Sequence, residues 1–117
     1  YQKRAEKVTL MTLHAAKGLE FPYVFIAGCE QGLLPLNLYP GQTTDVNEER
    51  RLLYVGMTRA QHQLWLTWAK SRHFQGRNLE LEKSPFLAAI ENELVEHARC
   101  EYKRSIKKID SQMMLFD

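Results

Sequence analysis

Tyr23-Val-Phe-Ile-Ala-Gly-Cys29 is the stretch of this 117-residue chain that decides its fold class. The run is apolar or small at every position, whereas a strand with one face in water alternates apolar and polar residues. A continuous apolar run of this length is typical of a strand that is covered on both faces in a parallel sheet. We therefore expect residues 23–29 to form a central strand.

The sequence on either side of this run predicts another strand and two connections. Val8 to His14 is β-branched and apolar enough for a strand. Between it and the central run, Gly18 and Pro22 rule out a long helix, so we expect a turn with a short helical piece. Glycines and prolines recur between positions 31 and 44, which indicates a surface connection.

A helix and a further strand are predicted after this connection. Asp45 with Glu48 three residues on has the form of a capping box, so a helix should run from near Asp45 to about Thr58. The stretch from His62 to Ala69 then alternates its side chains as a strand does. Strand, helix and strand in this order predict an α/β fold with a mainly parallel sheet and flanking helices, whose ligands sit beyond the carboxyl ends of the strands.

The last part of the chain is predicted to hold a docked helix and a tail. After a polar connection around residues 75–78, Ser84-Pro85 supplies an N-cap and a first-turn proline, and apolar residues recur at helical spacing from Phe86 to Leu94. Beyond about Ala98 the sequence turns polar and basic, and little fixed structure is expected there. The chain therefore divides into a domain over residues 1–98 and a tail over residues 99–117.

Composition and charge limit the kinds of protein that this can be. Hydrophobic residues make up 44% and charged residues 26%, which are ordinary values for a globular protein. A net charge of +2 gives no global positive field, so affinity for nucleic acid would have to come from where the basic residues sit. Cys29 and Cys100 lie outside any metal-binding spacing, and we interpret both as reduced thiols, with no metal site.

Two features of the sequence bear on where the protein is located in the cell: the first residues of the chain and the lack of long apolar runs. No signal peptide and no apolar run of about 18 residues is present, so a cytoplasmic location is expected. The chain begins with Tyr1 in a polar stretch, which suggests a piece of a longer protein.

The first candidate site is Thr12-Leu-His-Ala-Ala-Lys-Gly-Leu-Glu20, at the end of the first predicted strand. An open α/β sheet places its function at such an end. Gly18 lets the backbone approach a ligand closely, and free N–H groups at the next helical start suit an anion. His14, Lys17 and Glu20 bring polar side chains to the same turn. The alternative is that this turn is merely a connection.

The second candidate site lies at the end of the predicted helix. A guanidinium is always charged and binds phosphate oxygens through a rigid fork, so Arg59 on a firm element can stabilise charge on a transferring phosphoryl group. The alternative is that Arg59 caps the helix carbonyls. For Arg50 and Arg51 we favour surface pairs with Glu48 or Glu49.

Two long segments together resemble motifs of a known helicase family. Val8-Thr-Leu-Met-Thr-Leu-His-Ala-Ala-Lys-Gly-Leu-Glu-Phe-Pro22 closely resembles the fifth helicase motif of the UvrD/Rep/PcrA family of superfamily-one DNA helicases. Glu49-Arg-Arg-Leu-Leu-Tyr-Val-Gly-Met-Thr-Arg-Ala60 resembles the sixth, and Gly32-Leu-Leu-Pro35 between them is also similar. The resemblance covers about Val8 to Ile90. It implies the C-terminal portion of the second RecA-like motor domain of an ATP-dependent helicase and translocase.

The resemblance also implies roles for single residues. Arg59 corresponds to the arginine that reaches the γ-phosphate of the nucleotide across the cleft between two RecA-like domains, and it is the one catalytic residue assigned. Three residues are implied at the nucleotide: Gly18, Glu20 and Arg59. Three are implied at single-stranded DNA: Thr12, His14 and Lys17. Two more would orient the sixth motif: Tyr54 and Thr58.

The chain lacks the other half of such a site. It has no Gly-x-x-x-x-Gly-Lys-[Ser/Thr] phosphate loop and no Asp-Glu pair to hold Mg²⁺. By the resemblance both lie on the first motor domain, so ATP and Mg²⁺ would bind in the full-length protein, and the isolated chain should be inactive. The expected partners are single-stranded DNA and the first motor domain, and exposed sheet edges give the fragment a route to self-association.

The C-terminal segment Gln112-Met-Met-Leu-Phe116 resembles the Gln-x-x-Leu-Phe peptide by which bacterial replication and repair proteins dock on the sliding clamp. Leu115 and Phe116 would supply apolar anchors and Gln112 polar contacts. The alternative is an apolar terminus that folds back on the domain. For the chain as a whole, a clamp-docking module and the motor part of a nuclease-linked helicase are the alternative functions.

Overall fold

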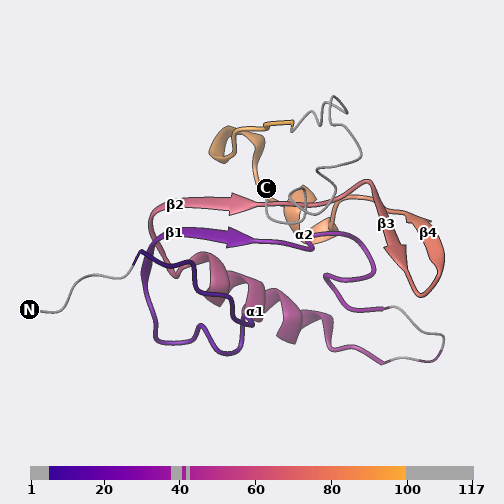
Figure 1. The fold of residues 1–117 in the computed structure, drawn as a ribbon, viewed down its shortest axis with the longest axis horizontal. Helices are drawn as coiled ribbons and strands as arrows, with labels where there is room; N and C mark the ends of the chain where they lie inside the picture. The colour runs from indigo at the N-terminus through magenta and orange to yellow at the C-terminus, as the bar shows by residue number, and fades with distance from the viewer. Residues whose placement is uncertain (1–5, 38–40, 42, 100–117) are drawn as a thin grey trace, which may run out of the picture.

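The computed structural model describes residues 6–37, 41 and 43–99, and its body is one β–α–β unit. Strand β1 (Phe21–Ile26) and strand β2 (Ala60–Leu66) pair in parallel, and helix α1 (Val46–Met57) connects them and lies against one face of the pair (Figure 1). The predicted α/β class and the parallel pairing are confirmed. The two strands are joined in register from Tyr23 opposite Gln63 to Ile26 opposite Leu66.

Helix α1 begins where the capping pattern predicts. The Asp45 side chain accepts hydrogen bonds from the backbone N–H groups of Asn47 and Glu48, at 3.1 and 3.2 Å. A cap of this kind stabilises a helix by about 1 kcal/mol because it satisfies donors that the helix itself leaves free. The helix ends at Met57 with Thr58 as its C-cap, so both predicted ends are confirmed within a residue.

The two strands are displaced toward the N-terminus from their predicted positions. Strand β1 covers residues 21–26 instead of 23–29, and β2 covers residues 60–66 instead of 62–69. The last three residues predicted for each strand continue past the ladder, where Cys29 N–H donates to the carbonyl of Thr67 and Thr67 N–H to that of Ile26. The apolar pattern locates the strands, but it does not locate their ends.

The prediction that residues 23–29 form a central strand covered on both faces is wrong for the described part of the chain. Val24 and Ile26 point to α1 and belong to the core, whereas Tyr23 and Phe25 are 61% and 67% exposed on the other face. Phe25 stacks on Trp65 of β2, with ring centroids 4.3 Å apart. In the described residues β1 pairs with β2 alone.

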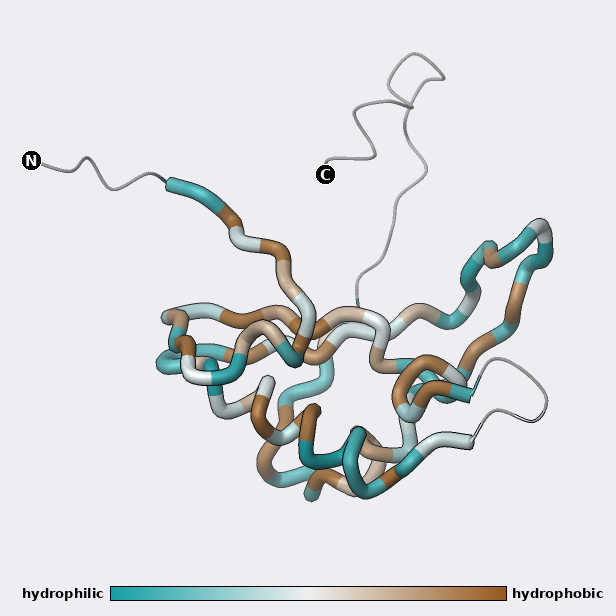
Figure 2. Tube along the Cα trace, turned by 90° about the horizontal axis from the view of Figure 1, so that it is seen from below, coloured by the Kyte–Doolittle hydropathy of each residue, from teal (hydrophilic) through white to brown (hydrophobic). Residues whose placement is uncertain are grey.

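The predicted strand over Val8 to His14 is also not formed. Val8 and Leu10 are 89% and 91% exposed, and the segment reaches away from the body of the fold before it joins the first turn (Figure 2). A strand exists only where a second strand accepts its hydrogen bonds, and the described residues offer this segment no such partner. Its β-branched composition therefore predicts a strand, but these residues pair with no other strand among the described residues.

A β-hairpin occupies the region that the sequence indicates only as a polar connection. Strand β3 (Ser71–Phe74) pairs antiparallel with strand β4 (Arg77–Glu80), and the hairpin projects beyond the parallel pair (Figure 1). Gln75 and Gly76 form its turn with φ of 50° and 76°. Two left-handed residues match the twist of a two-residue hairpin turn, and glycine adopts this conformation readily.

The last helix is shorter than predicted. Helix α2 (Pro85–Ala88) starts as expected, because Ser84 Oγ accepts from the N–H of Phe86 at 3.2 Å. It ends after one turn, and a 3-10 turn, η1 (Asn92–Leu94), follows. Leu94, predicted on the apolar side of a continuous helix, is 75% exposed. Only the first turn, which buries Phe86, is docked.

The hydrophobic core lies between α1, the parallel pair and α2. Its buried members come from every part of the unit and are Ile26, Cys29, Leu34, Leu53 and Phe86. Arg50 of α1 lies over the ring of Phe86, 5.1 Å from its centroid, and so helps hold α2 against α1. The predicted pairing of Arg50 with a glutamate is not what the structure shows, whereas Arg51 does form the expected ion pair with Glu48 at 3.5 Å.

An ion pair with one buried partner ties the hairpin to the end of β1. Glu30 is fully buried, and its Oε1 accepts from Arg72 Nη2 at 2.6 Å and from the N–H of Ala69 at 3.1 Å. Its backbone also bridges to Lys83, just before α2. The segments around Ala69, Arg72 and Lys83 therefore all meet at Glu30, a residue to which no sequence motif points.

Cys29 is predicted to be chemically inert in the folded chain. It is fully buried, and burial, followed by the charge of the adjacent Glu30, raises the pKa of its thiol from 9.0 to about 11. Because the folded pKa is the higher one, the stability gained from the neutral thiol is complete below pH 9 and is lost as the pH rises through 11. At about pH 8 we expect iodoacetamide to leave Cys29 unmodified in the native chain and to modify it readily in urea. Mass spectrometry of the Cys29 peptide measures this, and equal labelling in both states would contradict the buried position.

Some predicted features lie outside the described residues. They are Cys100 and, apart from Arg99, the predicted tail over residues 99–117, with Gln112, Leu115 and Phe116. Within the described ranges no helix is long and apolar enough to cross a membrane.

Candidate functional site

The first part of the site is a tight turn that crosses the C-terminal end of α1. Thr12 starts it: its Oγ1 accepts from the N–H of Ala15 at 3.1 Å, and its carbonyl accepts from the N–H of Ala16 at 3.2 Å. Gly18 ends it with φ of 82°, a left-handed conformation that glycine adopts without strain. The predicted short helical piece is therefore a turn over residues 13–18.

Arg59 sits where α1 ends, and its guanidinium is held by three oxygen atoms. Nε donates to the carbonyl of Val55 at 3.1 Å, Nη1 to the carbonyl of Leu19 at 3.2 Å, and Nη2 to Thr58 Oγ1 at 3.1 Å. A guanidinium has five N–H groups. These three bonds, the only ones it makes among the described residues, leave two N–H groups for an anion.

The contacts of Arg59 bear on both interpretations of this residue. The bond to Val55 confirms that Arg59 caps a helix carbonyl, as the alternative predicts. The bond to Leu19 joins it to the turn forty residues earlier, which a simple helix cap does not require. A side chain fixed from two directions is orientated before any ligand arrives, which is the condition for precise recognition of a phosphoryl group.

Glu20 is held at the start of β2 by Gln61, a residue that the sequence analysis missed. Gln61 Nε2 donates to Glu20 Oε2 at 3.2 Å, and the N–H of Phe21 donates to the carbonyl of Arg59 at 2.9 Å. Glu20 and Arg59 therefore lie at the adjacent starts of β1 and β2. No motif points to Gln61; only the parallel register, which places the start of β2 beside the start of β1, could have indicated it.

Leu13 packs against the helix at a glycine. A Cβ built on Gly56 would lie 2.4 Å from Leu13 Cδ2 and 3.3 Å from Ile26 Cδ1, so the close approach exists because position 56 has no side chain. Leu13 is partly buried against the core, while its neighbours Thr12 and His14 are exposed. The turn thus packs Leu13 against the helix and leaves Thr12 and His14 exposed to solvent.

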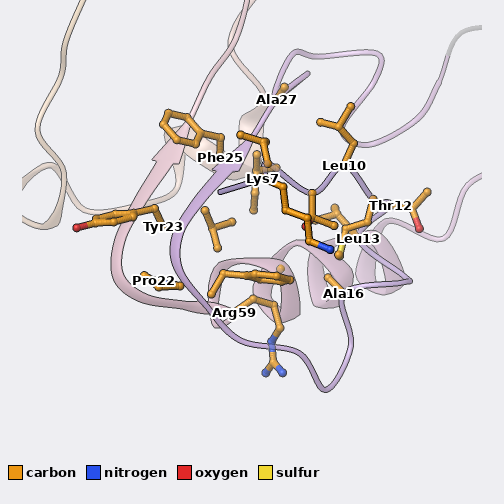
Figure 3. Close-up of a pocket in the computed structure, with 17 residues that line it drawn as sticks. Lys7, Leu10, Thr12, Leu13, Ala16, Pro22, Tyr23, Phe25, Ala27 and Arg59 are labelled. Carbon is orange, nitrogen blue, oxygen red and sulfur yellow. The ribbon is translucent and has the colours of Figure 1, made fainter. Parts of the chain in front are cut away.

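A hollow of about 730 Å³ separates the segment of residues 7–13 from β1. Figure 3 shows Leu10, Thr12 and Leu13 on one side, Phe25 on the other, and Arg59 with its guanidinium turned away from the interior. Its lining is mostly aliphatic and aromatic, which does not suit a triphosphate. We place the polar chemistry at the rim, where the guanidinium lies.

The predicted site residues are brought together only in part. Thr12 and Arg59 both line the hollow, and Gly18 and Glu20 flank the Leu19 carbonyl that Arg59 binds. His14 and Lys17 are exposed on the turn and make no hydrogen bond or ion pair within the described residues. The structure therefore groups the residues predicted for the nucleotide, and leaves these two side chains free at the surface.

Tyr54 and Thr58, the two residues predicted to orient the segment that resembles the sixth helicase motif, differ in their contacts with Arg59. Thr58 is part of the Arg59 network, since its Oγ1 donates to the carbonyl of Val55 and accepts from Arg59. Tyr54 lies on α1 with 68% of its side chain exposed and supplies only its backbone carbonyl, which accepts from the N–H of Thr58. Thr58, and not the Tyr54 ring, fixes the arginine.

The arrangement can bind an anion but cannot hold a metal ion by itself. The two remaining N–H groups of Arg59 suit a phosphate oxygen, and the Glu20 carboxylate follows directly on the Leu19 carbonyl that Arg59 binds. Among the described residues no three His, Cys, Asp or Glu side chains are grouped as metal ligands. A nucleotide with its Mg²⁺ would have to be presented from outside the described part of the chain.

Comparison with known proteins gives consistent matches to DNA helicases. Residues 1–71 match the model of the UvrD-like helicase C-terminal domain. The chain is 49% identical over 92 residues to the ATP-dependent DNA helicase PcrA of Bacillus subtilis, covering 79% of this chain and 12% of that protein. It is 51% identical over 92 residues to the ATP-dependent DNA helicase UvrD1 of Mycobacterium leprae, with the same coverage. With DNA helicase II of Escherichia coli it shares 46% identity over 94 residues, covering 80% of this chain and 13% of that protein. The chain thus spans only 12–13% of the length of these relatives.

Proposed function

Because this chain belongs to the family of UvrD-like helicase C-terminal domains, we propose that it completes the nucleotide site of an ATP-dependent DNA helicase from the second of two RecA-like motor domains. The observation that carries the proposal is the setting of Arg59. It stands at the end of α1, is held by the Leu19 carbonyl, and keeps two N–H groups free among the described residues.

In this function Arg59 stabilises the charge that develops on the transferring γ-phosphoryl group. An arginine finger acts by electrostatic stabilisation, which is strong when the guanidinium is already orientated and water is excluded. The bonds to Val55, Leu19 and Thr58 supply that orientation. Gly18 and Glu20, which flank the Leu19 carbonyl that holds Arg59, would lie beside the nucleotide.

Single-stranded DNA is proposed to bind at the same turn. Thr12, His14 and Lys17 are exposed, and their hydroxyl, imidazole and ammonium groups suit phosphate and base contacts. The turn would then touch DNA with these side chains while its Leu19 carbonyl holds the arginine. ATP binding, hydrolysis and release would be linked to the DNA strand through this one segment.

The residues present suit ATP, whereas no group of side chains among the described residues suits Mg²⁺. The guanidinium suits the terminal phosphate, which supplies the group that is transferred. Glu20 is bonded to Gln61 and has no second carboxylate grouped with it among the described residues. The Mg²⁺ ligands and the phosphate loop are therefore proposed to lie on the first motor domain of the same protein, which is the partner of this surface.

Single-stranded DNA should stimulate ATP hydrolysis by a full-length protein that contains this segment, while the isolated chain should hydrolyse no ATP. A finger lowers a barrier only when the other domain presents the nucleotide opposite it. Steady-state phosphate release, with and without an oligonucleotide, measures both. Hydrolysis by a preparation of the isolated chain free of contaminating helicase would contradict the proposal.

Three predictions stay separate from this proposal because they rest on the sequence alone. Docking on the sliding clamp through Gln112, Leu115 and Phe116 concerns residues outside the described part of the chain. Cytoplasmic location and the division into residues 1–98 and 99–117 likewise remain proposals. No contact in the described residues favours the nuclease-linked alternative over the helicase.

A further inference from the structure

Gly56 lies in the last turn of helix α1, where the close packing of Leu13 leaves no room for a side chain. Glycine in a helix interior costs about 1 kcal/mol relative to alanine, because it loses more backbone freedom on folding and packs no side chain. Gly56 is buried, and its missing Cβ leaves the space that Leu13 Cδ2 fills, 2.4 Å from where that Cβ would stand. The helix gives up local stability at the point where the turn meets it.

This contact determines which face the turn presents. With Leu13 seated over Gly56, the two flanking side chains, Thr12 and His14, are exposed. Six residues further on, the Leu19 carbonyl accepts from Arg59 Nη1 at 3.2 Å. The turn is thus fixed to the end of α1 at two points, one apolar and one polar, with the proposed DNA-binding side chains between or beside them.

Gly56 is also connected to Arg59 through the backbone. The carbonyl of Gly56 accepts from the backbone N–H of Arg59 at 3.2 Å. The residue against which Leu13 packs therefore also holds the backbone of Arg59. A displacement of Leu13 would therefore move the turn relative to the guanidinium, at the end of the helix where both are anchored.

We propose that Gly56 is a positioning residue: by admitting Leu13 it sets the turn so that single-stranded DNA bound at Thr12 and His14 is linked to the Leu19 carbonyl that holds Arg59. The inference rests on the proposed function and deepens it. It assigns the coupling between DNA binding and Arg59 to the packing of Leu13 on Gly56.

The test changes the size of the side chains at positions 56 and 13, singly and together, in a full-length protein that contains this segment. Gly56→Ala should raise the oligonucleotide concentration for half-maximal stimulation of ATP hydrolysis by roughly tenfold, because the added methyl group overpacks the contact and displaces Leu13. Leu13→Ala should raise it as well, because the turn loses its anchor. In the Gly56→Ala background, Leu13→Ala should instead lower this half-stimulating concentration, since the smaller side chain at position 13 relieves the clash.

Leu53→Ala is the matched control. Leu53 is 3% exposed on the same helix, and its truncation removes core packing while the Gly56 and Leu13 side chains keep their native sizes. It should lower the melting temperature and leave the half-stimulating concentration unchanged, which separates general destabilisation from positioning. Since alanine is a better helix former than glycine, Gly56→Ala should not prevent α1 from forming.

The outcomes separate this inference from the proposed function. If DNA stimulates the native protein but Gly56→Ala responds like native, or if Leu13→Ala is equally harmful in both backgrounds, the positioning role is wrong and the helicase function stands. If DNA fails to stimulate the native protein at all, the proposed function fails and the inference fails with it. The reversal in sign between the two backgrounds is the result that supports it.

Discussion

Arg59→Ala in a full-length protein that contains this segment is expected to lower ATP turnover by about three orders of magnitude while ATP binding stays largely intact. The guanidinium stabilises charge that develops on the phosphoryl group only during transfer. Loss of the guanidinium therefore lowers the rate of hydrolysis more than it lowers the affinity for ATP in the ground state. Turnover at saturating DNA, together with the dissociation constant of a fluorescent ATP analogue, measures the two effects separately.

Arg59→Lys is the informative companion to this variant. Lysine keeps the positive charge but lacks the planar fork, so it cannot bond to Val55, Leu19 and Thr58 and also face a phosphate. We expect turnover well below native, although above that of the alanine variant. Native turnover in Arg59→Ala would remove this residue from the proposed role, and native turnover in Arg59→Lys would show that its fixed orientation is unimportant.

The largest expected effect on stability comes from Arg72→Ala, at about 3 kcal/mol. Removing Arg72 leaves the charge of the fully buried Glu30 carboxylate without compensation. Glu30 is fully buried and Arg72 is 41% exposed at its side chain, so the carboxylate would keep only the N–H of Ala69 as a donor. Its other oxygen, Oε2, already has no hydrogen-bond partner among the described residues.

Urea unfolding of the chain, followed by circular dichroism, measures this effect. The midpoint should fall by roughly 1 to 3 M for Arg72→Ala. Arg77→Ala is the matched control, because Arg77 is exposed on the same hairpin and forms no ion pair among the described residues. Adding Glu30→Gln to Arg72→Ala should restore part of the loss by removing the unpaired charge. Equal midpoints for the two arginine variants would contradict the importance of this ion pair.

The sequence predicts the elements that depend on local chemistry. The helix start at Asp45 and the short helix start at Ser84 were both predicted from capping residues, and both caps are formed. The βαβ order was predicted from the alternation of apolar runs with a capped helix, and β1 and β2 pair in parallel. Capping and patterning are properties of neighbouring residues, so a single sequence contains them.

The errors concern features that depend on a distant partner. Residues 8–14 have strand composition but no strand to pair with in the described structure, and Tyr23 and Phe25 are apolar but covered on one face of the sheet alone. The hairpin was missed because its turn uses Gln75 in a left-handed conformation, where asparagine or aspartate is the usual signal.

The candidate site was predicted through its two motifs, and its connections were not. Thr12 and Arg59 were predicted on separate grounds, and the structure brings them to the rim of one hollow. The bond from Arg59 to Leu19 and the contact of Leu13 with Gly56 link positions about forty residues apart. No spacing rule gives such pairs, because they follow from the crossing of the turn over the helix end.

The most direct test of the central claim is a structure of the full-length protein with a non-hydrolysable ATP analogue, Mg²⁺ and single-stranded DNA. We expect an Arg59 N–H group within about 3 Å of a γ-phosphate oxygen, with Nη1 still bonded to the Leu19 carbonyl and the DNA strand at Thr12. An Arg59 that makes only its contacts within the chain, with the γ-phosphate bound elsewhere, would contradict it and leave this residue as a helix cap.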